Sequence, residues 1–308
     1  MTDALARRAA AHWPQITGQP VLFMQRENAV YRVDTTHGPH ALRLHRPGYH
    51  ATAVLQSELD LMAMLAGQGV LVPRPMATPD GALLVPLGDR HASLLSWLPG
   101  QPMGRSGQPL ALTGPARPAL FAAIGAQMAR LHALTDHWTP PPGFSRPRWD
   151  RDGLVGDAPF WGPFWNNADS ALLTGVRDLA RTMLDAAPPQ DMGLIHADLV
   201  NENVLVDGPH FHFIDFDDCG YGYRLFDLAT TLYKAVDEPD FPGLQAALLA
   251  GYAANRALPE LYLLPMFIVL RSLTYLGWIA ARASEPGMSA KADQYRAIAK
   301  RMIDRYLR

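Results

Sequence analysis

The 308-residue chain has a single cysteine, Cys219, and only three lysines, Lys234, Lys291 and Lys300. One cysteine excludes a disulfide framework and every zinc or iron–sulfur site that is built from several thiolates. Because the first 233 residues contain no lysine, that part of the chain can hold neither a Walker A phosphate loop, which needs a Gly-Lys pair, nor a lysine Schiff base.

Long apolar runs and an excess of one charge are also missing. The formal net charge is −2 at pH 7, and no arginine-rich run is present, so the basic footprint of a nucleic-acid-binding protein is absent. The first eight residues lack the apolar core of a signal peptide. The most apolar late stretch, 261–281, is interrupted by Pro265 and Arg271, which favours a buried helix over a membrane span. We therefore expect a cytoplasmic protein with neither a nucleic-acid partner nor a membrane partner.

Hydrophobic residues make up 48% of the chain, which is enough for a large core, and the length suggests two domains. Short β-prone runs occupy 21–24, 30–33, 41–44, 82–87 and 91–98, with one helix expected at 52–65. A Gly/Pro-rich stretch that begins at Leu98 then breaks this pattern. Residues 1–97 are predicted to form a β-rich lobe and residues 98–308 a larger, mostly helical lobe. The predicted fold class is α+β, with a cleft between the lobes.

One short β hairpin, with strands at 204–206 and 211–214, is predicted within the helical part. The pattern H-x-D-x-x-x-x-N precedes it, with His196, Asp198 and Asn203, and Asp215 follows it. If the hairpin loop contains an odd number of residues, Asn203 lies opposite Asp215 in the ladder, with Cβ atoms about 5 Å apart. An amide oxygen and a carboxylate at that distance suit Mg²⁺. An even loop would place the two side chains on opposite faces.

Two other interpretations of these polar residues stay open at this point. Asp and Asn residues beside a hairpin commonly satisfy the backbone groups of turns. The pair Asp215-x-Asp217 also resembles the nucleophile motif of haloacid dehalogenases. Those enzymes continue with a long α/β chain that contains a lysine, whereas helical sequence follows here.

A carboxylate beside a metal–phosphate site can orient a hydroxyl group and accept its proton. The pattern H-x-D-x-x-x-x-N, followed by an Asp that ends a strand, is the phosphoryl-transfer arrangement of kinase folds. With these motifs the chain resembles the aminoglycoside phosphotransferase/choline kinase superfamily, near the homoserine kinase and bacterial stress-response kinase groups. The resemblance spans nearly the whole chain, in the segments 27–33, 41–47, 57–59, 97–100, 129–132, 196–203, 214–218 and 227–229.

This resemblance implies a two-lobed, protein-kinase-like fold that binds ATP between its lobes. It also implies a role for each residue at a matching position. Asp198 would be the base that orients the acceptor hydroxyl, and the metal ligands would be Asn203, Asp215 and Asp217. The implied supporting residues are His196 and Asp227 for the catalytic loop, Ser96, Trp97 and Leu98 for the adenine-binding hinge, and Asn28, in the glycine-free loop 25–28, for the phosphates.

Arg43 stands where the superfamily usually has its phosphate-binding lysine. On the predicted helix 52–65, Glu58 shares one face with Val54, Leu61 and Leu65, so it lies within the apolar stripe. A carboxylate there needs a cationic partner, because a lone buried charge is costly. With no lysine in this lobe the partner must be an arginine or a histidine, and we expect Arg43. A slightly rotated helix would instead leave Glu58 on the surface.

The sequence thus predicts an ATP- and Mg²⁺-dependent phosphotransferase that acts on a hydroxyl of a small molecule, such as an amino alcohol. A bacterial Ser/Thr protein kinase of the stress-response type is an alternative, so a protein substrate stays open. An aminoglycoside phosphotransferase is a second alternative. Because of Arg43, a non-catalytic, nucleotide-binding pseudokinase module is a third. The fold accommodates many acceptors and does not choose among them.

Overall fold

The computed structural model describes residues 2–25, 28–105, 108, 110, 112–166, 169–188, 190–285 and 287–307. Arg26 and Glu27, which the predicted phosphate loop includes, lie outside these residues. The chain forms two compact units. Unit 1 comprises Met1–Pro102, Trp138–Arg146 and Val204–Asp217, and unit 2 comprises Met103–His137, Pro147–Asn203 and Asp218–Arg308. This division differs from the contiguous boundary expected at residue 97.

The predicted hairpin belongs to unit 1 because its backbone is bonded there. Its strands are β10 (Val204–Asp207) and β11 (His210–Phe213), and β10 also pairs with β7 (Gln101–Pro102). The Phe213 amide donates to the Leu71 carbonyl over 2.9 Å. Changes of composition along the chain do not show which distant segments form backbone hydrogen bonds with each other. A unit built from three separate segments was therefore not predicted.

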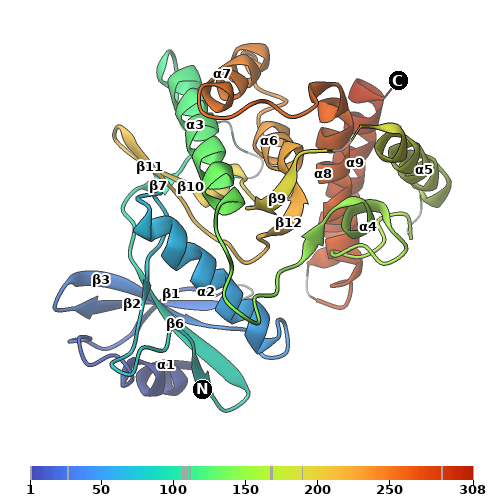
Figure 1. The fold of residues 1–308 in the computed structure, drawn as a ribbon. Helices are drawn as coiled ribbons and strands as arrows, with labels where there is room; N and C mark the ends of the chain where they lie inside the picture. Colours follow the sequence, from blue (N-terminus) through green and yellow to red (C-terminus); the bar gives the residue numbers. More distant parts are fainter. Residues whose placement is uncertain are drawn as a thin grey trace. The chain divides into compact units, whose positions relative to one another are not determined.

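Unit 1 is built on an antiparallel sheet, which Figure 1 shows beside α2. The strand order is β1-β2-β3-β6-β4, with β5 also paired to β6. The strands are β1 (Val21–Gln25), β2 (Ala29–Thr35), β3 (Gly38–Leu44), β4 (Pro75–Met76), β5 (Val85–Leu87) and β6 (Arg90–Ser96). Each β-prone run therefore contains a strand, although the run at 82–87 forms one only over Val85–Leu87 and the run at 91–98 ends as a strand at Ser96.

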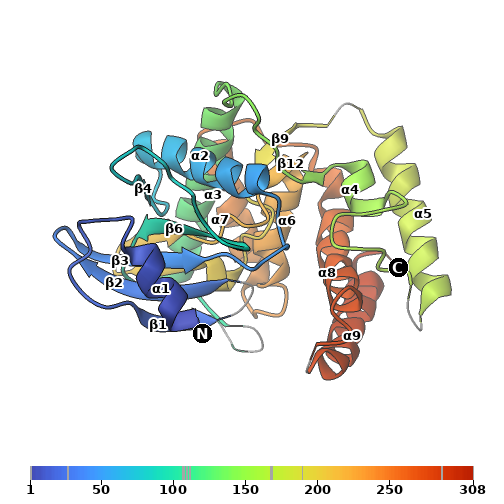
Figure 2. The same ribbon diagram turned by 90° about the horizontal axis from the view of Figure 1, so that it is seen from below.

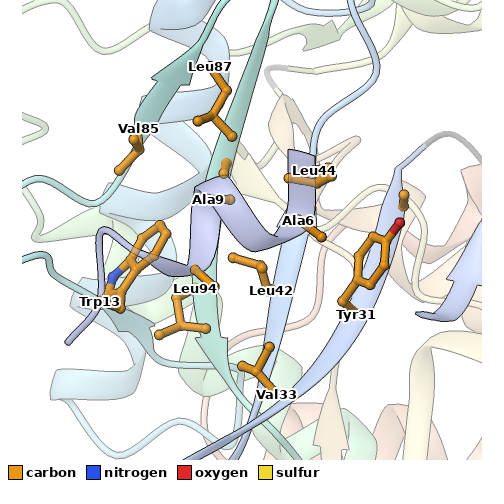
Figure 3. Packing of buried hydrophobic residues seen from close by; sticks show 13 residues of the cluster. Ala6, Ala9, Trp13, Tyr31, Val33, Leu42, Leu44, Val85, Leu87 and Leu94 are labelled. Atoms are coloured by element: carbon orange, nitrogen blue, oxygen red, sulfur yellow. The ribbon is translucent and has the colours of Figure 1, made fainter. Parts of the chain in front are cut away.

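Helix α1 (Thr2–Ala10) covers one face of this sheet and was not predicted. Alternate residues of β2 and β3, among them Tyr31, Val33 and Leu42, form a buried cluster with Ala6 and Trp13 (Figure 3). With only nine residues and three charged side chains, α1 has little helical stability of its own, since helices this short are marginal without tertiary packing.

Helix α2 (Thr52–Gly67) lies on the other face of the sheet (Figure 2). The helix begins where predicted and carries Glu58, whose side chain is 0% exposed. Successive side chains of β3 point to opposite faces of the sheet, so neighbouring residues contact different helices. Leu42 and Leu44 point to the α1 cluster, so Arg43 between them points to α2.

Unit 2 is mostly helical, with a three-stranded sheet in the order β8-β12-β9. Helices α3 (Ala116–Asp136) and α7 (Phe241–Ala253) cross at glycines: a Cβ on Gly125 would lie 2.1 Å from the Leu248 carbonyl oxygen. The other helices are α4 (Arg151–Val155), α5 (Ser170–Ala186), η1 (Asn201–Asn203), α6 (Arg224–Tyr233), η2 (Leu261–Leu263), α8 (Leu264–Ala280) and α9 (Met288–Tyr306). The strands are β8 (Arg148–Trp149), β9 (Met192–Ile195) and β12 (Gly220–Tyr223).

Within the described residues, one helical stretch, Leu261–Ala280, is long and apolar enough to cross a membrane by length and composition. Of its apolar window, 78% is buried inside the protein. This burial is what the sequence predicted for the stretch that contains Pro265 and Arg271.

Candidate active site

The loop between β9 and η1 carries His196 and Asp198 and is held by Asp227 of α6. The Asp227 carboxylate accepts hydrogen bonds from the backbone amides of His196, at 2.8 Å, and Ala197, at 2.7 Å. Ala197 adopts a left-handed backbone conformation with φ 66°, which costs free energy in a residue other than glycine. The two bonds to Asp227 hold this strained turn in place, so the turn sets the direction of Asp198.

Asp227 is itself supported by His132 of α3. His132 Nε2 lies 3.0 Å from Asp227 Oδ2, and His132 Nδ1 lies 2.9 Å from the Tyr252 hydroxyl. A carboxylate only accepts, so Nε2 carries the proton and Nδ1 accepts from tyrosine. Burial lowers the pKa of His132 to about 4. Burial alone would raise the pKa of Asp227, but hydrogen bonds from His132 and from the His196 amide hold it below its usual value.

This neutral histidine predicts how stability depends on pH. His132 has a pKa of about 4 in the folded chain against 6.5 when exposed, so the unfolded chain takes up the proton first. Stability is therefore full above pH 6.5 and falls as the pH drops toward 4. At 1.36 kcal/mol per pKa unit the loss from this group is about 3 kcal/mol. Urea unfolding at pH 8, 6 and 5 measures it.

His132→Gln should reduce the slope of stability against pH, because glutamine does not titrate. The variant should also be less stable than the parent protein at pH 8. The matched control is His137→Gln, which makes the same change at an exposed residue just after α3 and should leave the slope unaltered. Buried His45, with a pKa lowered to about 3 by burial, keeps part of the slope in every variant. An equal slope in His132→Gln and the parent protein would contradict the assignment.

Both carboxylate oxygens of Asp198 are engaged within unit 2. Asp198 Oδ1 accepts from Arg271 Nη2, and Asp198 Oδ2 accepts from Asn203 Nδ2 over 3.0 Å. The Asn203 amide also donates to the Asp198 carbonyl at 2.9 Å. Burial raises the pKa of Asp198 and the Arg271 guanidinium opposes that rise. Although these donors surround it, the side chain remains 19% exposed, so a further group can reach it.

Arg43 of unit 1 joins two carboxylates. Arg43 Nη1 donates to Glu58 at 2.6 Å, and Arg43 Nη2 donates to Asp217 at 3.1 Å. The predicted Arg43–Glu58 ion pair is confirmed, and the surface alternative for Glu58 is wrong. Burial alone would lower the pKa of Arg43, but the carboxylates of Glu58, Asp217 and Asp215 outweigh it and raise it.

Asp217 accepts hydrogen bonds at both oxygens from other residues of unit 1. Arg43 bonds Oδ1, Asn28 Nδ2 lies 3.4 Å from Oδ2, and His50 Nε2 lies 4.0 Å from the same oxygen. A carboxylate surrounded in this way favours a role in fixing Arg43 and Asn28 over direct contact with a metal ion.

The odd-numbered hairpin loop that would bring Asn203 opposite Asp215 is not present. Asp207 pairs with His210, so the connection at Gly208-Pro209 has two residues, and the last ladder pair is Val204 with Phe213. Continued past that pair, the register would place Asn203 opposite Ile214. The ladder ends there instead: Asn203 belongs to the 3₁₀ turn η1, and Asp215 has φ 67°. Strand alternation therefore does not set the direction of either side chain.

Asn203 and Asp215 are the other two predicted metal ligands. The described residues contain no group of three or more His, Cys, Asp or Glu side chains that could hold a metal ion. Mg²⁺ in phosphoryl-transfer enzymes takes one or two protein oxygens and fills its other positions with phosphate and water. The amide oxygen of Asn203 and the carboxylate of Asp215 fit that requirement as oxygen donors.

The predicted hinge begins with Ser96, the last residue of β6, and continues with Trp97 and Leu98. The Ser96 hydroxyl accepts from the Arg74 amide at 2.9 Å, and the Trp97 ring meets Phe23 of β1 edge-on at 4.9 Å. Ser96 and Leu98 also line a hollow of about 290 Å³ with Ala66, Gly69, Val70, Leu71, Val72, Arg74 and His212. These contacts fix the hinge backbone inside unit 1.

Comparison with known proteins decides the family. The sequence profile of the phosphotransferase enzyme family matches residues 24–264. The chain belongs to this family. It is 31% identical to a homoserine kinase of Nitrobacter winogradskyi over 248 residues, 76% of this chain and 69% of the relative. It is 30% identical to an uncharacterized protein of Deinococcus radiodurans over 287 residues, 87% of this chain and 80% of the relative.

Solved structures give the same assignment. A microcompartment-associated aminopropanol kinase superposes with a TM-score of 0.81 at 31% identity, over 99% of this chain and 97% of that one. Amicoumacin kinase, solved in complex with AMP-PNP, Ca²⁺ and Ami, superposes with a TM-score of 0.77 at 20% identity, over 98% of this chain and 94% of that one. The predicted α+β, protein-kinase-like fold is confirmed. The predicted class of enzyme, a phosphotransferase that acts on a small-molecule hydroxyl, is confirmed as well.

Three residues of the site region had no role assigned from the sequence: His132, Arg146 and Arg271. Arg146 donates to the backbone carbonyls of Val54 and Phe216. His132 ends a segment that carries the family resemblance, and this was the available signal. The sequence signal for Arg271 was weaker. It is a charged residue within an apolar stretch, and a buried charge needs a partner.

Proposed function

We propose that this phosphotransferase uses ATP with Mg²⁺ to phosphorylate the hydroxyl of a small amino alcohol. The observation that carries the proposal is the placement of Asp198. The Asp227 hydrogen bonds fix its loop, Arg271 and Asn203 fix its carboxylate, and the side chain keeps 19% exposure. A fixed and partly exposed carboxylate suits the orientation of an attacking hydroxyl group.

In the proposed reaction, Asp198 accepts the proton of the acceptor hydroxyl as the acceptor oxygen bonds to the γ-phosphorus. The bond between that phosphorus and the departing ADP oxygen breaks. Asn203 and Asp215 are the proposed ligands of Mg²⁺, which when bound offsets phosphate charge. The proposed ATP contacts are Arg43 and Asn28 for the phosphates and the backbone of Ser96, Trp97 and Leu98 for adenine, with Glu58 and Asp217 holding Arg43 and His196 supporting the catalytic loop.

An amino alcohol is favoured as acceptor by charge near Asp198. The cation of Arg271 is already paired with the Asp198 carboxylate. Asp218 is a second carboxylate whose charge acts on Arg271, and it accepts from the indole N–H of Trp161 at 3.1 Å. Carboxylates and aromatic faces are the groups that attract an ammonium ion. The aminopropanol kinase acts on a molecule of this kind, and the likeness to it supports the same choice here.

An ATP-consumption screen tests the proposal with 1-amino-2-propanol, ethanolamine, homoserine, an aminoglycoside and a generic protein substrate. We expect turnover with the amino alcohols and at most weak turnover with the others. Turnover of protein alone would favour the protein-kinase alternative. Nucleotide binding without turnover of any acceptor would favour the pseudokinase alternative. A cytoplasmic location, where ATP is available, is proposed together with this activity.

Asp215→Asn should abolish Mg²⁺-dependent turnover. Asparagine tolerates the left-handed backbone at this position, where φ is 67°, so the change removes charge without new strain. Activity is measured across a Mg²⁺ titration. Asp207→Asn, the same change at an exposed residue that ends β10, is the control and should behave as the parent protein. Full activity of Asp215→Asn at low Mg²⁺ would remove Asp215 from the metal site.

A further inference from the structure

Arg271 lies in the middle of α8 and is fully buried, with a side chain that is 0% exposed. Its neighbours on the helix, Leu270, Ser272 and Leu273, are buried as well. A buried ion pair generally contributes no more to stability than well-packed apolar residues of similar volume. The presence of arginine here therefore calls for a reason other than stability.

The guanidinium is fixed by contacts from several directions. Its carbon lies 4.8 Å from the centre of the Trp161 ring and 4.5 Å from that of Tyr275. Nη2 donates to the Tyr275 hydroxyl at 2.9 Å, and Nη1 donates to Thr274 Oγ1 at 3.2 Å. An arginine can donate to several partners from one planar group and lie against aromatic rings at the same time, whereas a lysine offers a single point charge.

Trp161 is held in its turn. Its indole N–H donates to Asp218 at 3.1 Å, and its ring meets that of Trp149 edge-on at 5.3 Å. Trp149 is 0% exposed and donates its own indole N–H to the Asp218 carbonyl at 2.7 Å. The position of Arg271 is thus set by a chain of packed aromatic rings that ends in the core of unit 2.

Arg271 and Asn203 hold Asp198 from two sides. Arg271 Nη2 bonds one carboxylate oxygen, and Asn203 Nδ2 bonds the other at 3.0 Å. Two donors in fixed positions define the plane of the carboxylate and prevent its rotation. An error of about 1 Å in the position of a reacting group can cost a factor of about 100 in rate.

We propose that Arg271 is a positioning residue for phosphoryl transfer, which aims the Asp198 carboxylate at the acceptor hydroxyl and does not bind a carboxylate of the acceptor. This inference rests on the proposed function, because it assumes that Asp198 receives the hydroxyl proton. In the competing role, Arg271 would bind a carboxylate of the acceptor. The Nε of Arg271 has no hydrogen-bond partner among the described residues, and such a carboxylate would supply one.

The test compares Arg271→Met and Arg271→Lys with the parent protein by steady-state kinetics. We expect Arg271→Met to lower kcat about 100-fold, with KM for ATP and for 1-amino-2-propanol within threefold of the parent values. Arg271→Lys should recover about tenfold of that loss, because the ammonium restores the charge without the planar fork. Arg282→Met is the matched control: Arg282, which is only partly exposed, also stacks on a tryptophan, 4.3 Å from the Trp278 ring, and should leave kcat unchanged.

The second arm uses homoserine, which carries a carboxylate, beside 1-amino-2-propanol, which does not. A positioning role lowers kcat equally for every acceptor that is turned over. A rise in KM for homoserine alone, with kcat preserved, would show a carboxylate receptor and overturn the proposal. A folded Arg271→Met protein with kcat within threefold of the parent value would also overturn it.

Circular dichroism and thermal unfolding show which variants are folded. If Arg271→Met does not fold, Arg271→Lys and Tyr275→Phe decide. The second variant removes one hydrogen bond from the guanidinium, and a loss of kcat of about twofold to fivefold is expected, at unchanged KM. Parent kcat in both of these variants would overturn the proposal. A parent protein that phosphorylates no acceptor would instead refute the proposed function, which separates the two failures.

Discussion

Asp198→Asn should lower kcat by a factor of about 10² to 10⁴, the usual contribution of a positioned acid–base group, and leave the dissociation constant for ATP within about threefold. The amide cannot accept the hydroxyl proton. It also cannot satisfy both neighbours, since Arg271 and Asn203 each donate to a carboxylate oxygen and an amide has one oxygen. ATP affinity should survive because the proposed nucleotide contacts come from other residues.

Single-turnover kinetics and isothermal titration with ATP measure the two quantities separately. Asp207→Asn makes the same acid-to-amide change at an exposed residue and should match the parent protein in both. Loss of a hydrogen bond to the buried Arg271 should also lower stability, by about 1.5–3 kcal/mol. A loss of ATP affinity that matches the loss of kcat would show that Asp198 holds the nucleotide or the fold.

Arg43→Met should both destabilise unit 1 and weaken ATP binding. Glu58 is 0% exposed and pairs with Arg43 at 2.6 Å, so the variant leaves a buried carboxylate without its partner, at a cost of about 3–5 kcal/mol. A charge-assisted hydrogen bond to phosphate is worth about 1.5–3 kcal/mol, so ATP affinity should fall about tenfold to a hundredfold. Arg43→Lys should be milder, although one ammonium on a shorter reach replaces a fork that bonds Glu58 and Asp217.

A double variant separates the two effects. Arg43→Met with Glu58→Met replaces the ion pair by apolar residues, and such replacements are often neutral or stabilising. Much of the lost stability should return, while ATP affinity stays low. Arg8→Met, at an exposed position of α1, controls for the change of residue type. Unchanged ATP affinity in Arg43→Met would contradict the phosphate-binding role.

The sequence pattern predicted the strands of the β10–β11 hairpin but not the directions of the site residues beside it. Both strands were predicted from their β-prone runs, but the loop has two residues and the ladder stops at Val204 and Phe213. Pairing periodicity applies only while the ladder continues. Beyond it, the direction of Asn203 depends on a 3₁₀ turn and that of Asp215 on a left-handed backbone. Long-range packing sets both, and a short stretch of sequence does not encode it.

The sequence by itself determined the family, the catalytic motif and the Arg43–Glu58 pair. The catalytic motif is a fixed spacing along the chain, so it can be recognised without the structure. A carboxylate on an apolar helix face needs a cationic partner, and a segment without lysine offers few of them. Only the tertiary structure decided that Arg271 bonds Asp198 and that His132 supports Asp227. Those partners lie 73 and 95 residues apart, and their meeting depends on how helices pack, which no local spacing records. A buried charge signals that it has a partner, but only the folded chain shows which residue that partner is.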